Sequence, residues 1–155
     1  MSSNIYSENQ SFWNWWLIVL LIVISYLSLE PLISGKEVLN TSSYISIGIL
    51  ICVLLFFLVV RLRTTIDEYG ITIRFFPFVR KKSWQWEFIN EVYVTEYSIL
   101  DYGGWGYRVS KKGKAYNTKG KYGIQLILKN GARIMVGTQN PETVRQVIDK
   151  LKNQN

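Results

Sequence analysis

Two long apolar segments stand near the start of the chain. Residues 12–29, FWNWWLIVLLIVISYLSL, and residues 44–60, YISIGILICVLLFFLVV, contain no charged side chain. Helices over these segments would be roughly 26 Å long, which is close to the roughly 30 Å hydrocarbon core of a bilayer. Tryptophans at 13, 15 and 16 open the first segment, and such rings prefer the headgroup level. The pattern predicts a hairpin of two transmembrane helices.

The distribution of charge predicts how this hairpin is oriented. The connection at residues 30–43 contains one basic residue, Lys36, whereas Arg61 and Arg63 follow the second segment directly. Because basic residues accumulate on the cytoplasmic side of membranes, we expect the C-terminal part to face the cytoplasm. Two spans then place the N-terminus there too. The expected localisation is a multi-pass protein of the cell membrane, with both termini cytoplasmic.

After residue 61 the hydrophobic period changes to two. The segment GITIRFF at residues 70–76 alternates apolar and polar positions, and it predicts a hairpin over residues 64–76 with Gly70 in its turn. Pro77 ends the second strand of that hairpin. Further strands are predicted at residues 82–84, 91–97, 123–128 and 133–136, and Asn130-Gly131 is a hairpin turn between the last two.

A helix is predicted at the C-terminal end. Asn140 suits the N-cap, Pro141 suits the first helical position, and the apolar positions 144, 147, 148 and 151 form one stripe. We therefore expect two parts: residues 1–60 with the transmembrane hairpin, and residues 61–155 as a β-rich α+β domain.

The segments IDEYGITIRFFPF, WEFINEVYV and GIQLILKNGARIMVGTQNPE resemble a bacterial pleckstrin-homology-like (PH-like) domain over roughly residues 63–152. Together with the two preceding spans, the chain resembles small membrane proteins of that type. The resemblance implies a partly open antiparallel β-barrel capped by the C-terminal helix. Phosphoinositide-binding relatives carry basic residues around the first hairpin turn, whereas the turn here, Asp67–Gly70, is acidic.

The composition excludes several kinds of chemistry. Histidine is absent and Cys52 is the only cysteine, which excludes an intrachain disulfide, a histidine acid or base and the usual zinc sites. No spacing indicates a carboxylate pair, a nucleophile elbow or a phosphate-binding glycine loop. We therefore expect no enzyme, no catalytic residue, no metal and no cofactor.

The two parts of the chain differ in charge, and this difference indicates the partner. Residues 1–60 have one basic and three acidic side chains, a net charge of −2, whereas residues 61–155 have 17 basic and 8 acidic ones, a net charge of +9. For a basic domain attached to a bilayer we expect acidic lipids rather than nucleic acid. The candidate headgroup contacts are Arg61, Arg63, Arg80, Lys81 and Lys82.

A second candidate surface lies in the long connection at residues 100–121. Its centre contains Trp105, Tyr107 and Arg108 among glycines. These residues either contact a partner or the membrane, or they cover an open edge of the barrel. Two functions remain open: a membrane-tethered interaction or scaffold module, or a sensor that binds anionic lipid headgroups. The expected partner beyond the bilayer is an anionic lipid or another membrane protein.

Overall fold

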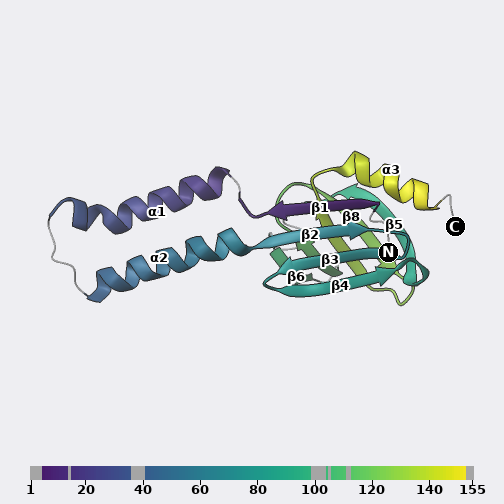
Figure 1. The fold of residues 1–155 in the computed structure, drawn as a ribbon, viewed down its shortest axis with the longest axis horizontal. Helices are drawn as coiled ribbons and strands as arrows, with labels where there is room; N and C mark the ends of the chain where they lie inside the picture. The colour runs from purple at the N-terminus through teal and green to yellow at the C-terminus, as the bar shows by residue number, and fades with distance from the viewer. Residues whose placement is uncertain are drawn as a thin grey trace. The chain divides into compact units, whose positions relative to one another are not determined.

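The computed structural model describes residues 5–13, 15–35, 41–98, 104, 106–110 and 113–152. The chain divides into two compact units (Figure 1). The helical unit is Phe12–Val60, and the β unit combines Met1–Ser11 with Arg61–Asn155.

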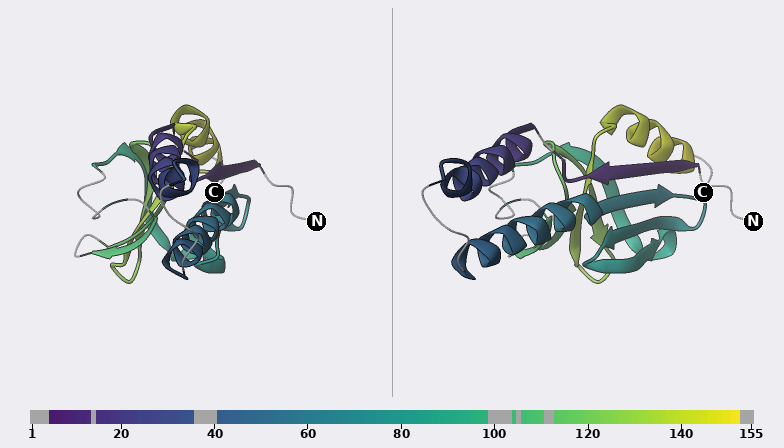
Figure 2. Two further views of the ribbon diagram at one scale, coloured as in Figure 1. Left: turned by 90° about the vertical axis from the view of Figure 1, so that its left-hand side faces the viewer. Right: turned by 60° about the vertical axis from the view of Figure 1, so that its left-hand side comes forward.

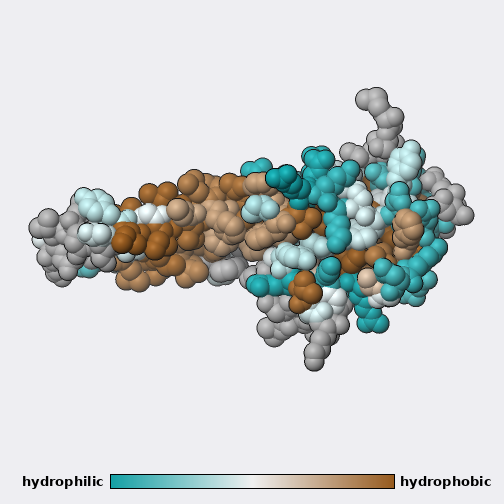
Figure 3. Space-filling view, turned by 90° about the horizontal axis from the view of Figure 1, so that it is seen from below, coloured by the Kyte–Doolittle hydropathy of each residue, from teal (hydrophilic) through white to brown (hydrophobic). Residues whose placement is uncertain are grey.

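The helical unit consists of two helices, α1 (Trp15–Ile33) and α2 (Thr41–Val59). Leu17 and Leu21 of α1 are buried. Most other apolar side chains of the pair are exposed, and Figure 3 shows apolar residues over the surface of the helices.

The prediction of two transmembrane helices is wrong for this structure. No helix among the described residues is long and apolar enough to cross a membrane. Helix α1 includes the charge of Glu30, so its uncharged part at residues 15–29 is only roughly 22 Å long. Helix α2 has a polar first turn, and its apolar part at residues 44–59 is roughly 24 Å long, against a core of roughly 30 Å. The structure therefore does not support transmembrane spans at 12–29 and 44–60. The predicted multi-pass localisation in the cell membrane, with both termini cytoplasmic, is wrong for the same reason.

The first sheet of the β unit contains four antiparallel strands in chain order. These are β1 (Tyr6–Ser11), β2 (Arg61–Ile66), β3 (Gly70–Phe76) and β4 (Val79–Gln85). Although both helices separate β1 from β2 in sequence, the two strands are neighbours, with Tyr6 opposite Ile66 and Ser11 opposite Arg61. The helical unit is thus an insertion between two adjacent strands.

The second sheet follows a short helical turn, η1 (Trp86–Phe88). Its strands are β5 (Ile89–Glu96), β6 (Gly106–Ser110), β7 (Gly113–Asn117), β8 (Tyr122–Leu128) and β9 (Arg133–Thr138), in the spatial order β5-β8-β9-β7-β6. The pairing of β7 with β9 is parallel, and the other pairings are antiparallel. Helix α3 (Pro141–Lys152) begins at Pro141, as predicted, and packs on β5 and β8.

The core of the β unit lies between the two sheets and under α3 (Figure 2). The period-two pattern of the strands turns one face of each sheet inward. The ring of Trp84 on β4 lies 6.1 Å from the ring of Tyr116 on β7, so the two sheets are in direct contact. The core includes Leu62, Ile66, Ile71, Ile73, Phe75, Ala115, Ile124, Leu126, Val136, Val144, Ile148 and Leu151.

Strand β1 is attached to the second sheet by buried polar contacts. The side-chain amide of Gln10 donates a hydrogen bond to the carbonyl oxygen of Gly137 at 2.7 Å, and its oxygen accepts one from the hydroxyl of Thr118 at 2.9 Å. Buried polar groups need such partners, because an unpaired one forfeits its hydration.

The carboxylate of Glu8, on the same strand, accepts three hydrogen bonds. The donors are the hydroxyl of Thr138 at 2.7 Å, the backbone N–H of Gln139 at 2.7 Å and the hydroxyl of Tyr6 at 2.8 Å. Burial, followed by the bond to this carboxylate, raises the pKa of the Tyr6 phenol to about 12. Glu8 therefore connects β1 to the end of β9.

The fold class implied by the PH-like resemblance is also corrected. The resemblance implied a partly open antiparallel barrel, whereas the β unit has two sheets, a parallel pair in the second sheet and a strand that precedes both helices. Two of the unpredicted strands, β6 and β7, lie in the segment expected to be a long connection. In the described part of the chain, the architecture is α+β with two sheets and three helices.

Candidate anion-binding face

Three arginines share the outward face of the first sheet. Arg61 and Arg63 are two residues apart on β2, and the register places Arg74 of β3 directly opposite Arg63. All three side chains are exposed. Directly opposed residues have Cβ atoms only about 5 Å apart, so their guanidinium groups can reach one common ligand. We call Arg61, Arg63 and Arg74 the arginine face.

No carboxylate offsets this charge within the described residues. The neighbours on β1 are uncharged, with Asn9 opposite Arg63 and Ser11 opposite Arg61. No ion pair joins any of the three arginines to another residue that the structure describes. Like charges placed opposite each other destabilise a sheet, so the pair of Arg63 and Arg74 weakens the free fold. Guanidinium groups bind phosphate and carboxylate in two-pronged geometry, and such an anion would relieve the repulsion.

The turn between β3 and β4 adds exposed aromatic rings beside the arginine face. Phe76 lies opposite Arg61 and is 53% exposed, and Phe78 is 49% exposed. The ring of Phe78 lies 5.2 Å from the ring of Phe75, which is a buried residue on the inward face of β3. One end of the first sheet therefore combines cations with two apolar rings.

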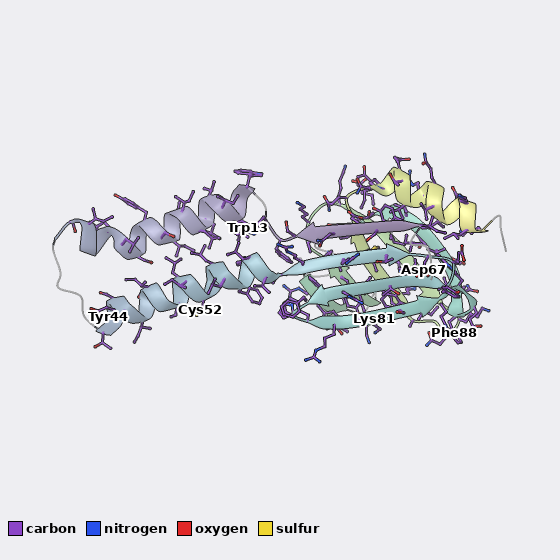
Figure 4. The ribbon with its side chains drawn as sticks, in the orientation of Figure 1. Trp13, Tyr44, Cys52, Asp67, Lys81 and Phe88 are labelled. Atoms are coloured by element: carbon purple, nitrogen blue, oxygen red, sulfur yellow. The ribbon has the colours of Figure 1, made fainter. Side chains whose placement is uncertain are left out.

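The predicted cluster at residues 80–82 is divided by the sheet. Arg80 and Lys81 follow the turn on β4 and are exposed, and Figure 4 shows Lys81 on this strand. Lys82 instead pairs with the buried Ile73 and holds its ammonium 5.6 Å from the centre of the Trp84 ring. Burial, and then the charge of Lys114, lower the pKa of Lys82.

Arg74 was not among the predicted contacts. Its alternation with Ile73 and Phe75 places it on the polar face of the β3 segment. Its position opposite Arg63 depends on the hairpin register, which follows from the length of the turn.

The second predicted surface lies partly outside the described residues, because Trp105 does. Tyr107 and Arg108 are exposed residues of β6, and the ring of Tyr107 stacks on that of Tyr116 at 5.1 Å. Burial, and then the neighbouring Tyr107, raise the pKa of Tyr116 to about 12. Tyr107 therefore covers the aromatic contact between the two sheets.

Tyr116 should make the β unit sensitive to alkali. The fold raises its pKa from 10.0 to about 12, so its contribution to stability is complete below pH 10 and is lost as the pH rises toward 12. Tyr116→Phe cannot ionise, and we expect its alkaline unfolding midpoint to lie at higher pH than that of the wild type. Circular dichroism against pH measures this shift. The exposed Tyr93→Phe is the control, and a shift of equal size in both variants would contradict the assignment.

Two cavities of the β unit are lined without Asp or Glu. One, of about 470 Å³, lies between β4, η1 and the β8–β9 turn, and its lining includes Trp84, Phe88 and Lys129. Another, of about 220 Å³, lies between β5 and α3 and is lined in part by Trp86 and Ile148. No group of three His, Cys, Asp or Glu within the described residues could hold a metal ion.

The helical unit provides an apolar surface. Ile22, Leu27, Tyr44, Ile45 and Ile49 are each more than half exposed. Monomeric proteins rarely leave a large contiguous apolar patch in water. Cys52 is also exposed on α2.

Comparison with known proteins identifies no family. No protein-family model matches the chain, and no curated protein matches it. The resemblance to bacterial PH-like membrane proteins is therefore not supported, and the candidate site depends on the geometry of the β unit itself.

Proposed function

We propose that the chain is a binding module rather than an enzyme, and that its arginine face holds an anionic partner. The observation that carries the proposal is the direct opposition of Arg63 and Arg74 without a carboxylate among the described residues. The repulsion between the two guanidinium groups lowers the stability of the free protein. A bound anion between them would attract both groups and would make the arrangement stabilising.

The surroundings of the arginine face suit an anion. The hydroxyls of Thr72 and Ser83 lie 2.9 Å apart on the outward side of β3 and β4, and Thr65 lies opposite Thr72. Hydroxyl groups can donate to the same oxygens that the guanidinium groups bind. The three arginines are exposed, and none of them lines either of the two β-unit cavities described above. This suits the binding of a surface or a chain more than the enclosure of a substrate.

Two classes of partner share this chemistry. An acidic segment of another protein would make the chain an interaction or scaffold module, and acidic lipid headgroups would make it a lipid binder. The exposed apolar helices favour an interaction role in either case, since they offer a second contact surface.

Arg74→Gln should separate binding from stability. Without anion, the variant should be more stable than the wild type by about 0.5 kcal/mol, because the repulsion from Arg63 is gone. With tripolyphosphate, the wild type should gain stability and the variant should gain much less. Urea unfolding of the full chain in a neutral detergent, with and without tripolyphosphate, measures both quantities.

The matched control is Lys150→Gln, which removes the same charge from an exposed position on α3. It should retain the full response to tripolyphosphate. If both variants lose the response equally, stabilisation by tripolyphosphate depends only on the net charge of the protein, and the proposal fails.

A further inference from the structure

The turn between β3 and β4 carries two large apolar side chains at the surface of the β unit. Phe76 and Phe78 flank Pro77, and each leaves about half of its surface in water. Phenylalanine rings are usually buried in a core, because burial of their large apolar surface stabilises the fold. Two neighbouring exposed rings lose part of this stabilisation. Phe78 packs in part on Phe75, but about half of each ring is left uncovered by the fold.

Cations surround these rings. Arg61 lies opposite Phe76, and Arg63 and Arg74 form the pair two positions further along the hairpin. Arg80 and Lys81 come directly after the turn. Apolar rings next to arginines and lysines are the composition of surfaces that lie in the headgroup region of a bilayer. There the rings enter the acyl boundary while the cations hold the phosphates.

From this arrangement we infer that the anionic partner is an acidic lipid surface, into which the β3–β4 turn inserts Phe76 and Phe78. The inference rests on the proposed anion-binding function and adds the source of the anion. A free phosphate would use the arginines alone and would leave both rings in water. The rings also lie on a turn rather than in a pocket, and the cavities described above are lined by other residues.

The surface of a bilayer matches these features together. It presents many phosphates, which several cations can contact at the same time. Small apolar side chains can also enter its acyl boundary. About five cations take part, and each contributes to attraction by a negatively charged surface. The replacement of Arg61, Arg63 and Arg74 by Gln should therefore weaken binding to acidic vesicles by about 100-fold.

The test places a dye that reports apolar surroundings on the turn. The full chain carries Cys52→Ser and Phe78→Cys, labelled at the new thiol. We expect its emission to shift to the blue with vesicles that contain phosphatidylglycerol, and not with vesicles of phosphatidylcholine alone. The control is Phe88→Cys in η1, beyond the opposite end of β4, where the native side chain is 56% exposed. The label there should not respond, and melting curves of both labelled proteins confirm that they are folded.

Each result decides between the source of the anion and the anion site itself. A response at position 78 that requires acidic lipid and is lost with the three arginines supports the inference. Equal responses at positions 78 and 88, or none at 78, overturn it.

If tripolyphosphate still stabilises the wild type and not Arg74→Gln, the anion site stands and its ligand is soluble. Stabilisation by polyglutamate without a response at position 78 would assign the face to an acidic protein. Loss of every anion response would refute the proposed function as well.

Discussion

Ile148→Asp should leave the β unit unfolded under conditions in which the wild type is folded. Ile148 is 3% exposed, and it lies at the centre of the face that α3 packs on β5 and β8. The substitution removes a packed side chain and buries an unpaired carboxylate, a combination that costs about 5 kcal/mol or more. A domain of this size has a total stability of only about 5 to 15 kcal/mol. Far-ultraviolet circular dichroism and limited proteolysis measure the loss.

The control for this substitution lies two residues away on the same helix. Gln146 is exposed, so Gln146→Asp introduces the same charge with no change in burial. Its melting temperature should stay within a few degrees of that of the wild type. Similar melting temperatures for the two variants would show that α3 is not part of the core.

Glu8→Ala should destabilise the β unit by about 3 kcal/mol. The carboxylate of Glu8 is buried and accepts hydrogen bonds from the hydroxyl of Thr138 and the backbone N–H of Gln139, both at 2.7 Å. Removal of the carboxylate leaves these two donors and the hydroxyl of Tyr6 without their acceptor. The cost is the lost hydration of those groups as well as the bonds themselves. The free energy of unfolding in urea measures the loss.

The loss of stability in Glu8→Ala should be concentrated on β1. Since Glu8 and Gln10 attach this strand to the second sheet, amide protons of β1 should exchange faster in Glu8→Ala than in the wild type. Asn9→Ala, on the exposed face of the same strand, should change neither stability nor exchange by a comparable amount. An equal loss in both variants would mean that the polar contacts of Glu8 do not hold β1.

The local pattern was enough to predict several elements of the β unit. Alternation in GITIRFF predicted the hairpin of β2 and β3, and the Asn130-Gly131 turn joins β8 to β9 as expected. The start of α3 at Pro141 follows from its cap and its apolar stripe. These elements are encoded by residues close together in sequence, and for that reason they can be read without the fold.

The apolar segments of the helical unit were identified as helices for the same reason, but their interpretation as transmembrane spans was wrong. The helix ends depend on where the backbone leaves the helical path, and α1 begins at Trp15 and includes Glu30. A count of apolar residues does not contain that information.

The strands and helices with a local signal, the absence of histidine chemistry and the concentration of positive charge after residue 60 all follow from the order and kinds of residues alone. Only the tertiary structure placed β1, because its inward residues, Glu8 and Gln10, are polar and its partner strand is separated from it by both helices. Only the structure set Arg74 opposite Arg63 and turned Lys82 away from the exposed cluster at residues 80–82. Strand pairing is a contact between residues distant in sequence, and a shift of one residue in register reverses which side chains share a face. The composition of the arginine face is therefore present in the sequence, whereas its geometry exists only in the folded sheet.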